Sequence, residues 1–256
     1  MRMLVALASA VTLLAAVPAP AAVDYQGAWT LSPAADGVTL RLQLQWGDGS
    51  TWNRVMEESA FSGLSGTQAD AAPGGFSIRE DAGTFQFTGA YRERRGAGRF
   101  RFLPRREFGA TLRALGIQGA AQVSDRDLMN LAFGGLAAAD IAEFRALGVP
   151  VATMDEVMTL AVQQVSPEYV RALQGLGATD ANTVNAVVAA RMFGLAPELV
   201  RELATVGIRG LPLDGYVDIR RAGVTPAFVR EVRAAGHTRL LPDALIDLRR
   251  AARARP

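Results

Sequence analysis

The 256 residues hold 27 basic and 25 acidic side chains, one histidine and no cysteine. Without cysteine the chain has neither disulfides nor thiol chemistry, and a single histidine cannot build a His/Cys metal site. Every basic residue is arginine, and the near balance of charge gives no general attraction for an anionic partner.

The N-terminus has the form of an export signal. Arg2 precedes an apolar run at residues 3–17, and a small-residue cleavage site follows that ends at Ala21. The run is shorter than the roughly 20 apolar residues that span a bilayer. We therefore expect residues 1–22 to be a signal peptide, with an uncleaved anchor as the alternative. The mature chain is then exported, periplasmic or extracellular, without an integral membrane span.

Alternating hydrophobic residues predict a small β domain at residues 23–107. The clearest run is residues 38–46, in which Val38 and every second residue after it is apolar. A second pair of alternating runs lies within residues 76–88, on either side of a turn. About six short antiparallel strands of this kind form either a sandwich or a partly open barrel.

From residue 108 onward the hydrophobic period becomes helical and the sequence repeats. A glycine closes each unit, at spacings of 32, 29, 30 and 29 residues: Gly116, Gly148, Gly177, Gly207 and Gly236. Midway between these glycines lies a second junction before an apolar residue: Gly135, Gln164, Gly194 and Gly223. A repeat of about 29 residues, present about 4.5 times in residues 108–256, predicts an all-α array.

Each unit contains the signals of two short helices. Ser166 and Thr225 stand at N-cap positions, and a proline follows each of them at the first helical position. Helices of about nine residues do not persist alone, so neighbouring units must bury each other's apolar faces. We expect Leu173 and Leu203 to be buried there. The fold class is thus α+β, a small antiparallel β domain followed by short helical hairpins.

The segment 213–236, LDGYVDIRRAGVTPAFVREVRAAG, resembles a 29-residue helical repeat of many bacterial envelope proteins. That repeat also occurs at the C-terminus of some membrane metallopeptidases of the beta-lactam-sensor type. The resemblance covers about residues 108–250, and residues 81–104 are similar to the β segment that precedes such repeats in secreted members. It implies an envelope protein without assigned catalytic residues. The zinc motif His-Glu-x-x-His is absent, so peptidase activity does not carry over.

The residues give no catalytic, cofactor or metal site. The single histidine, His237, directly follows the last closing glycine, which favours a loop position. The acidic pairs Asp125/Asp127 and Asp155/Glu156 stand at predicted helix starts, where carboxylates cap the backbone. We expect no enzyme and no cofactor, and a hydrolase is the least favoured function.

One stretch has an uneven charge. Between residues 92 and 106 a single acid, Glu93, accompanies seven arginines: Arg92, Arg94, Arg95, Arg99, Arg101, Arg105 and Arg106. Residues 95–98 are expected to be flexible, and residues 99–102 form a strand on which Arg99 and Arg101 share one face. The stretch is either a solvated strand face or a contact for an anionic partner.

Two functions remain open from the sequence. The first is a non-enzymatic protein-interaction module of unknown partner, because stacked repeats expose a continuous surface. The second is binding of an anionic envelope ligand, a lipid or polysaccharide phosphate, through the arginine-rich strand face, because arginine forks match phosphate. The export signal argues against nucleic acid.

Overall fold

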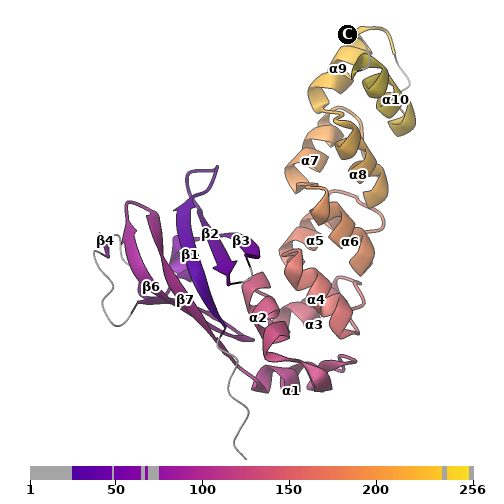
Figure 1. Cartoon of the computed structure of the whole chain (residues 1–256). Helices are drawn as coiled ribbons and strands as arrows, with labels where there is room; N and C mark the ends of the chain where they lie inside the picture. The colour runs from indigo at the N-terminus through magenta and orange to yellow at the C-terminus, as the bar shows by residue number, and fades with distance from the viewer. Residues whose placement is uncertain (1–24, 48, 65–66, 69–74, 238–240, 254–256) are drawn as a thin grey trace, which may run out of the picture.

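The computed structural model describes residues 25–47, 49–64, 67–68, 75–237 and 241–253. It is an α+β structure in which a curled β-sheet precedes a stack of short helices (Figure 1). The expected signal peptide at residues 1–22 lies outside the described part of the chain. Among the described helices, none combines the length and the apolar character needed to cross a membrane.

The β part is one antiparallel sheet of seven strands in the order β3-β2-β1-β7-β6-β4, with β5 paired to β6. The strands are β1 (Gln26–Pro33), β2 (Leu40–Trp46), β3 (Thr51–Met56), β4 (Thr67–Gln68), β5 (Phe76–Glu80), β6 (Gly83–Arg92) and β7 (Arg95–Pro104). The sheet curls into a half-barrel (Figure 1), so the open barrel, and not the sandwich, is the correct form. Strand β3 lies at one edge of it.

Aromatic side chains fill the concave side of the sheet. Trp29 meets Phe76 and Phe87 edge to face at centroid distances of 5.0 and 5.9 Å, a favourable geometry for aromatic rings. The indole also covers Gly96, where an added Cβ would lie 2.9 Å from the Trp29 ring. Residues 95–98 were expected to be flexible, but they form the start of β7. The glycine at position 96 leaves space there for the indole of Trp29.

The start of β2 also differs from the prediction. Val38 was expected to begin the strand and face the core, but it lies in a turn with its side chain 66% exposed. The Asp36 carboxylate accepts hydrogen bonds from the Thr39 hydroxyl and from the backbone N–H groups of Thr39 and Val38, both N–H bonds at 2.9 Å. The hydroxyl first, and then these N–H groups, lower the pKa of Asp36. This local turn competes with strand formation, so β2 begins only at Leu40.

Ten α-helices follow in the described residues after β7. They are α1 (Glu107–Ala114), α2 (Asp125–Gly134), α3 (Ala138–Ala146), α4 (Met154–Val162), α5 (Pro167–Gly175), α6 (Val184–Met192), α7 (Pro197–Thr205), α8 (Leu213–Ala222), α9 (Pro226–Ala234) and α10 (Pro242–Arg253). From α2 onward they stack in two rows (Figure 1). Helices α2, α4, α6, α8 and α10 contact one another in succession, and α3, α5 and α7 form the second row.

The predicted start and stop signals are confirmed. The side chain of Ser166 accepts a bond from the N–H of Tyr169, and Ser124 forms a reciprocal capping box with Asp127. The five closing glycines all have a positive φ, for example 75° at Gly116 and 91° at Gly236. This left-handed conformation costs a residue without Cβ nothing, which explains the repeated glycine.

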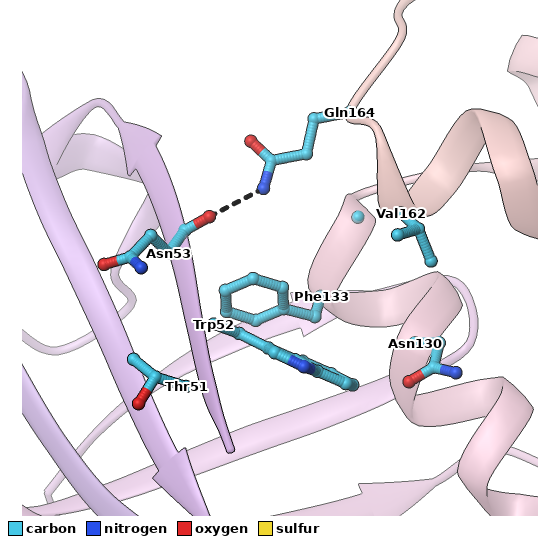
Figure 2. A pocket seen from close by; sticks show the side chains of 8 residues that line it. Thr51, Trp52, Asn53, Asn130, Phe133, Val162 and Gln164 are labelled. Atoms are coloured by element: carbon cyan, nitrogen blue, oxygen red, sulfur yellow. Dashed lines mark hydrogen bonds between the residues drawn. The ribbon is translucent and has the colours of Figure 1, made fainter. Parts of the chain in front are cut away.

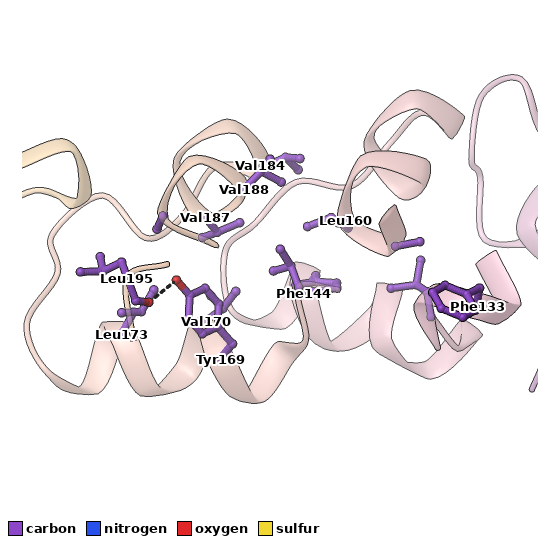
Figure 3. Close-up of a cluster of buried hydrophobic side chains, with 14 of the residues drawn as sticks. Phe133, Phe144, Leu160, Tyr169, Val170, Leu173, Val184, Val187, Val188 and Leu195 are labelled. Atoms are coloured by element: carbon purple, nitrogen blue, oxygen red, sulfur yellow. Dashed lines mark hydrogen bonds between the residues drawn. The ribbon is translucent and has the colours of Figure 1, made fainter. Parts of the chain in front are cut away.

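The core of the array runs between the two rows (Figure 3). Leu173 and Leu203 are fully buried, as predicted. The Tyr169 hydroxyl donates a 2.8 Å hydrogen bond to the carbonyl of Leu195 in the following junction, and burial raises its pKa to about 12. The apolar faces tie each unit to its neighbours, and this one bond also links α5 to the junction before α7.

Glycine is also required where α2 meets α4, and this generates a prediction. A Cβ on Gly134 would lie 2.3 Å from the backbone oxygen of Ala161. We expect Gly134→Ala to lower the free energy of unfolding by about 1–3 kcal/mol, because the backbone must move. The matched change Gly175→Ala, in open space near the end of α5, should instead raise it by up to about 1 kcal/mol. Urea unfolding measures both, and equal effects would contradict the close approach of the two helices.

Candidate functional site

The sheet and the helical array meet at Phe133, near the end of α2. Its ring lies 5.2 Å from Trp52 of β3 and 6.2 Å from Phe85 of β6, measured between ring centroids. Only 7% of Phe133 is exposed. We call the row of α2, α4, α6, α8 and α10 the even row. Its first helix, α2, thus packs into the half-barrel, against both an edge strand and a central strand.

Arg54 of β3 adds a polar clamp to this contact. Its guanidinium forms a 2.7 Å ion pair with Glu80 and donates a 3.3 Å bond to the carbonyl of Ala132, in the last turn of α2. A cation suits this position because helix C-terminal carbonyls carry partial negative charge. A Cβ on Gly135 would lie 2.1 Å from Arg54 Nη2, so the glycine of this junction also gives the guanidinium access.

A second set of polar contacts fixes the first helices. Asp81, in the turn before β6, accepts a 2.9 Å bond from the N–H of Ala138 at the start of α3. Arg105 faces the same carboxylate at 3.5 Å. Arg106 forms a two-pronged pair with Asp125 at 2.9 and 2.7 Å, and this bond lowers the pKa of Asp125. Arg106 therefore links the end of the sheet to the start of α2, and Arg105 pairs with the carboxylate that holds the start of α3.

A pocket of about 260 Å³ opens beside this junction. We call it the elbow pocket, and it is lined by Thr51, Trp52, Asn53, Asn130, Phe133, Gly134, Val162 and Gln164 (Figure 2). Gln164, which follows α4, donates a 2.8 Å hydrogen bond from Nε2 to the backbone carbonyl of Asn53. Edge strand β3 and two helices of the even row thus enclose a space with aromatic and carboxamide walls.

The backbone at Gln164 is unusual. Its φ is 51°, whereas the three equivalent junctions carry glycine at 71°, 65° and 71°. A side chain in the left-handed region costs about 1 kcal/mol or more. The observed reason for a side chain here is its bond to Asn53, which links the array to the sheet.

An exposed apolar line leaves the elbow pocket along the even row. Val162 at the end of α4 is 57% exposed, and Met192 and Phe193 at the end of α6 are 61% and 43% exposed. The repeat places residues 133, 162 and 192 at equivalent positions, so they follow one another along the stack. The guanidinium of Arg221 lies 4.8 Å from the Phe193 ring centroid and ends the line. We call Val162, Met192 and Phe193 the apolar column.

The structure separates the seven candidate arginines into two groups. Arg105 and Arg106 serve the junction, and Arg94 is also committed to the fold. Its guanidinium donates to the carbonyls of Gly37 and Val38, the first at 2.6 Å, and its Nε lies 3.6 Å from Glu58. Arg94 therefore ties the β6–β7 hairpin to the β1–β2 turn and is not available as a surface charge.

The other candidate arginines lie exposed on the convex face of the sheet. Arg92 and Arg95 are direct cross-strand partners, and Arg99 and Arg101 follow on β7. Two further exposed arginines, Arg41 on β2 and Arg79 on β5, were not anticipated, although both occupy outward positions of alternating strands. We call these six residues the arginine face. On the described strands other than β4, no acidic residue occupies an outward-facing exposed position.

The carboxyl groups with shifted pKa values occur in structural roles. Glu156 caps the start of α4, and hydrogen bonds from Ala152 and Thr153 lower its pKa. Burial raises the pKa of Asp140, which accepts a bond from the N–H of Ala137 at the start of α3. Throughout the described residues, no three His, Asp or Glu side chains gather as metal ligands. His237 is exposed after α9.

Sequence reasoning did not identify the elbow pocket. Trp52, Asn130 and Gln164 come from segments that only the docking of sheet and helices brings together. The one available signal was Gln164, the single non-glycine residue among the four midway junctions. Comparison with models of protein families, with curated proteins and with solved structures gives no match to this chain.

The Arg54 clamp generates a prediction about the junction. We expect Arg54→Ala to lower the free energy of unfolding by about 3 kcal/mol, because it leaves Glu80 and the Ala132 carbonyl partly buried without their cation. Breaking the exposed pair of Arg221 and Asp218 with Asp218→Ala should cost less than about 0.5 kcal/mol. Thermal and urea unfolding compare the two, and a similar small loss for both would refute the clamp.

Proposed function

We propose that this chain is an exported, non-enzymatic scaffold whose helical array binds another protein through the apolar column. The observation that carries the proposal is the exposure of Val162, Met192 and Phe193 at the ends of α4 and α6. Exposed apolar side chains that lie together, and not singly, are typical of interaction surfaces.

The repeat explains why these side chains form one surface. Neighbouring helices in a row lie about 8–10 Å apart, so equivalent positions of successive units stand side by side. Val162 and Met192 are such equivalents. The buried residues of each unit stabilise the array, whereas these side chains contribute little to its core. Their hydrophobic character is better explained by a partner that covers them.

The test places a photo-crosslinking residue at position 192 in the full chain, expressed in its own cells. The control carries the same residue at position 230, an exposed arginine of α9, which continues the second row beyond α7 (Figure 1). We expect a discrete adduct from position 192 alone, and Phe193→Ser should abolish it. The purified partner should then bind the Val162→Ser, Met192→Ser double variant about tenfold more weakly or worse. No adduct, or equal adducts from both positions, would refute the proposal.

The arginine face supports a second candidate function, contact with an anionic envelope ligand. Arg92 and Arg95 lie directly opposite each other on adjacent strands, an arrangement of like charges that destabilises a sheet. Outward-facing acids are lacking on the described strands apart from β4, and the turn between Arg92 and Arg95 adds one exposed carboxylate, that of Glu93. Phosphate groups of a lipid or polysaccharide have the complementary charge and geometry.

This second function has its own measurement. We expect the full chain to bind vesicles that contain phosphatidylglycerol, and the Arg95→Gln, Arg99→Gln variant to bind about tenfold more weakly or worse, since each surface arginine contributes about 1 kcal/mol. Its salt dependence should also be shallower. The Arg201→Gln, Arg230→Gln variant removes the same charge from the helices and should bind normally. Equal loss in both variants would mean that only net charge matters.

A further inference from the structure

The elbow pocket has a wall chemistry unlike that of the apolar column or the arginine face. Its lining contains no ionisable side chain. It combines the indole of Trp52 and the ring of Phe133 with the carboxamides of Asn130 and Gln164, whereas Asn53 contributes its backbone and its carboxamide points away (Figure 2). Such a lining offers a flat apolar surface together with neutral hydrogen-bond donors and acceptors.

The carboxamides of Asn130 and Gln164 have unused hydrogen-bonding capacity. Asn130 Oδ1 is buried and has no hydrogen-bond partner. Gln164 uses Nε2 for the Asn53 carbonyl, and its Oε1 accepts no bond among the described residues. A buried acceptor without a partner is unfavourable, so native structures rarely retain one without a reason such as a ligand or water.

The backbone at Gln164 agrees with this assignment, because a strained residue holds a carboxamide at the pocket with Nε2 bound to Asn53. The repeat places glycine at this junction in three other units, and glycine would relieve the left-handed conformation at φ 51°. Strained residues that persist tend to lie at binding sites. Gln164 reaches over the elbow pocket toward β3 (Figure 2), where its carboxamide stands beside the ring of Phe133.

We propose that the elbow pocket binds an uncharged sugar ring. The C–H face of a pyranose packs on an aromatic side chain, here Trp52, while its hydroxyl groups both donate and accept hydrogen bonds, as the carboxamides of Asn130 and Gln164 require. A charged ligand finds no counter-charge in the lining. A purely apolar ligand leaves Asn130 Oδ1 unpaired.

This site is distinct from the contact proposed for the helical array. It depends on Trp52, Asn130 and Gln164, whereas the proposed protein contact depends on Met192 and Phe193, which do not line the pocket. Val162 is the one residue that both surfaces share. Either proposal can therefore fail without the other.

The experiment titrates the full mature chain with uncharged saccharides: glucose, N-acetylglucosamine and its tetramer. Tryptophan fluorescence follows Trp52 together with Trp29 and Trp46, so comparison with Trp52→Ala isolates the part of Trp52, and calorimetry gives the stoichiometry. We expect saturable binding at one site, with a changed emission that is lost in Trp52→Ala. Asn130→Ala should weaken binding about tenfold, and the exposed control Asn182→Ala should leave it unchanged.

Gln164→Gly separates binding from folding. Loss of the bond to Asn53 and relief of the left-handed backbone at φ 51° have opposite effects on stability, so this variant should stay folded while it binds the saccharide about fivefold more weakly. A folded protein that binds none of the saccharides would overturn the proposal. So would binding that is the same in Gln164→Gly and Asn130→Ala as in the parent chain. Binding of a neutral acetylated peptide amide, but of no saccharide, would assign the pocket to a peptide and equally overturn it.

Discussion

The contact of Phe133 with the half-barrel joins two hydrophobic cores, each of which is incomplete alone. The sheet curls only partway, so its concave side needs a cover. The helices have 8 to 12 residues and depend on neighbours for burial. Helix α2 begins the even row, and it finds on β3 and β6 the apolar surface that a preceding helix supplies elsewhere. The sheet thus caps the array at the end where the repeat begins.

Polar contacts give this hydrophobic junction a defined orientation. Apolar packing alone tolerates rotation of one part against the other, because the hydrophobic effect has no direction. Arg54 fixes the end of α2 against β3, and Asp81 fixes the start of α3 against the turn before β6. Gln164 adds a third point farther along the row. Three bonds at separate places leave the two parts of the molecule with one relative orientation, so the elbow pocket has a fixed shape.

The parts of the structure that could be predicted are those determined by local chemistry. Caps such as Ser166 act within one turn, and the alternation that places Leu40 in the core acts within one strand. Val38 was misplaced because the Asp36 turn forms in the same short stretch and outcompetes the strand. Arg94 could not be assigned its role, since its partners lie more than 30 residues away in the chain. The elbow pocket was beyond prediction for the same reason.

Comparison of equivalent positions in the repeat also indicates which exposed side chains of the array are not explained by stability of the fold. The equivalent positions at the ends of successive even-row helices hold Phe133, Val162, Met192 and Arg221, a progression from buried aromatic to charged. Packing of the core does not require this order of residue types, because the side chains of Val162, Met192 and Arg221 all reach solvent. Apolar character therefore concentrates near the sheet and decreases along the stack. A ligand or partner that exploits it must approach along the ends of α4 and α6, from the point where Gln164 meets β3, and the charged far end of the row contributes at most the rim of that contact.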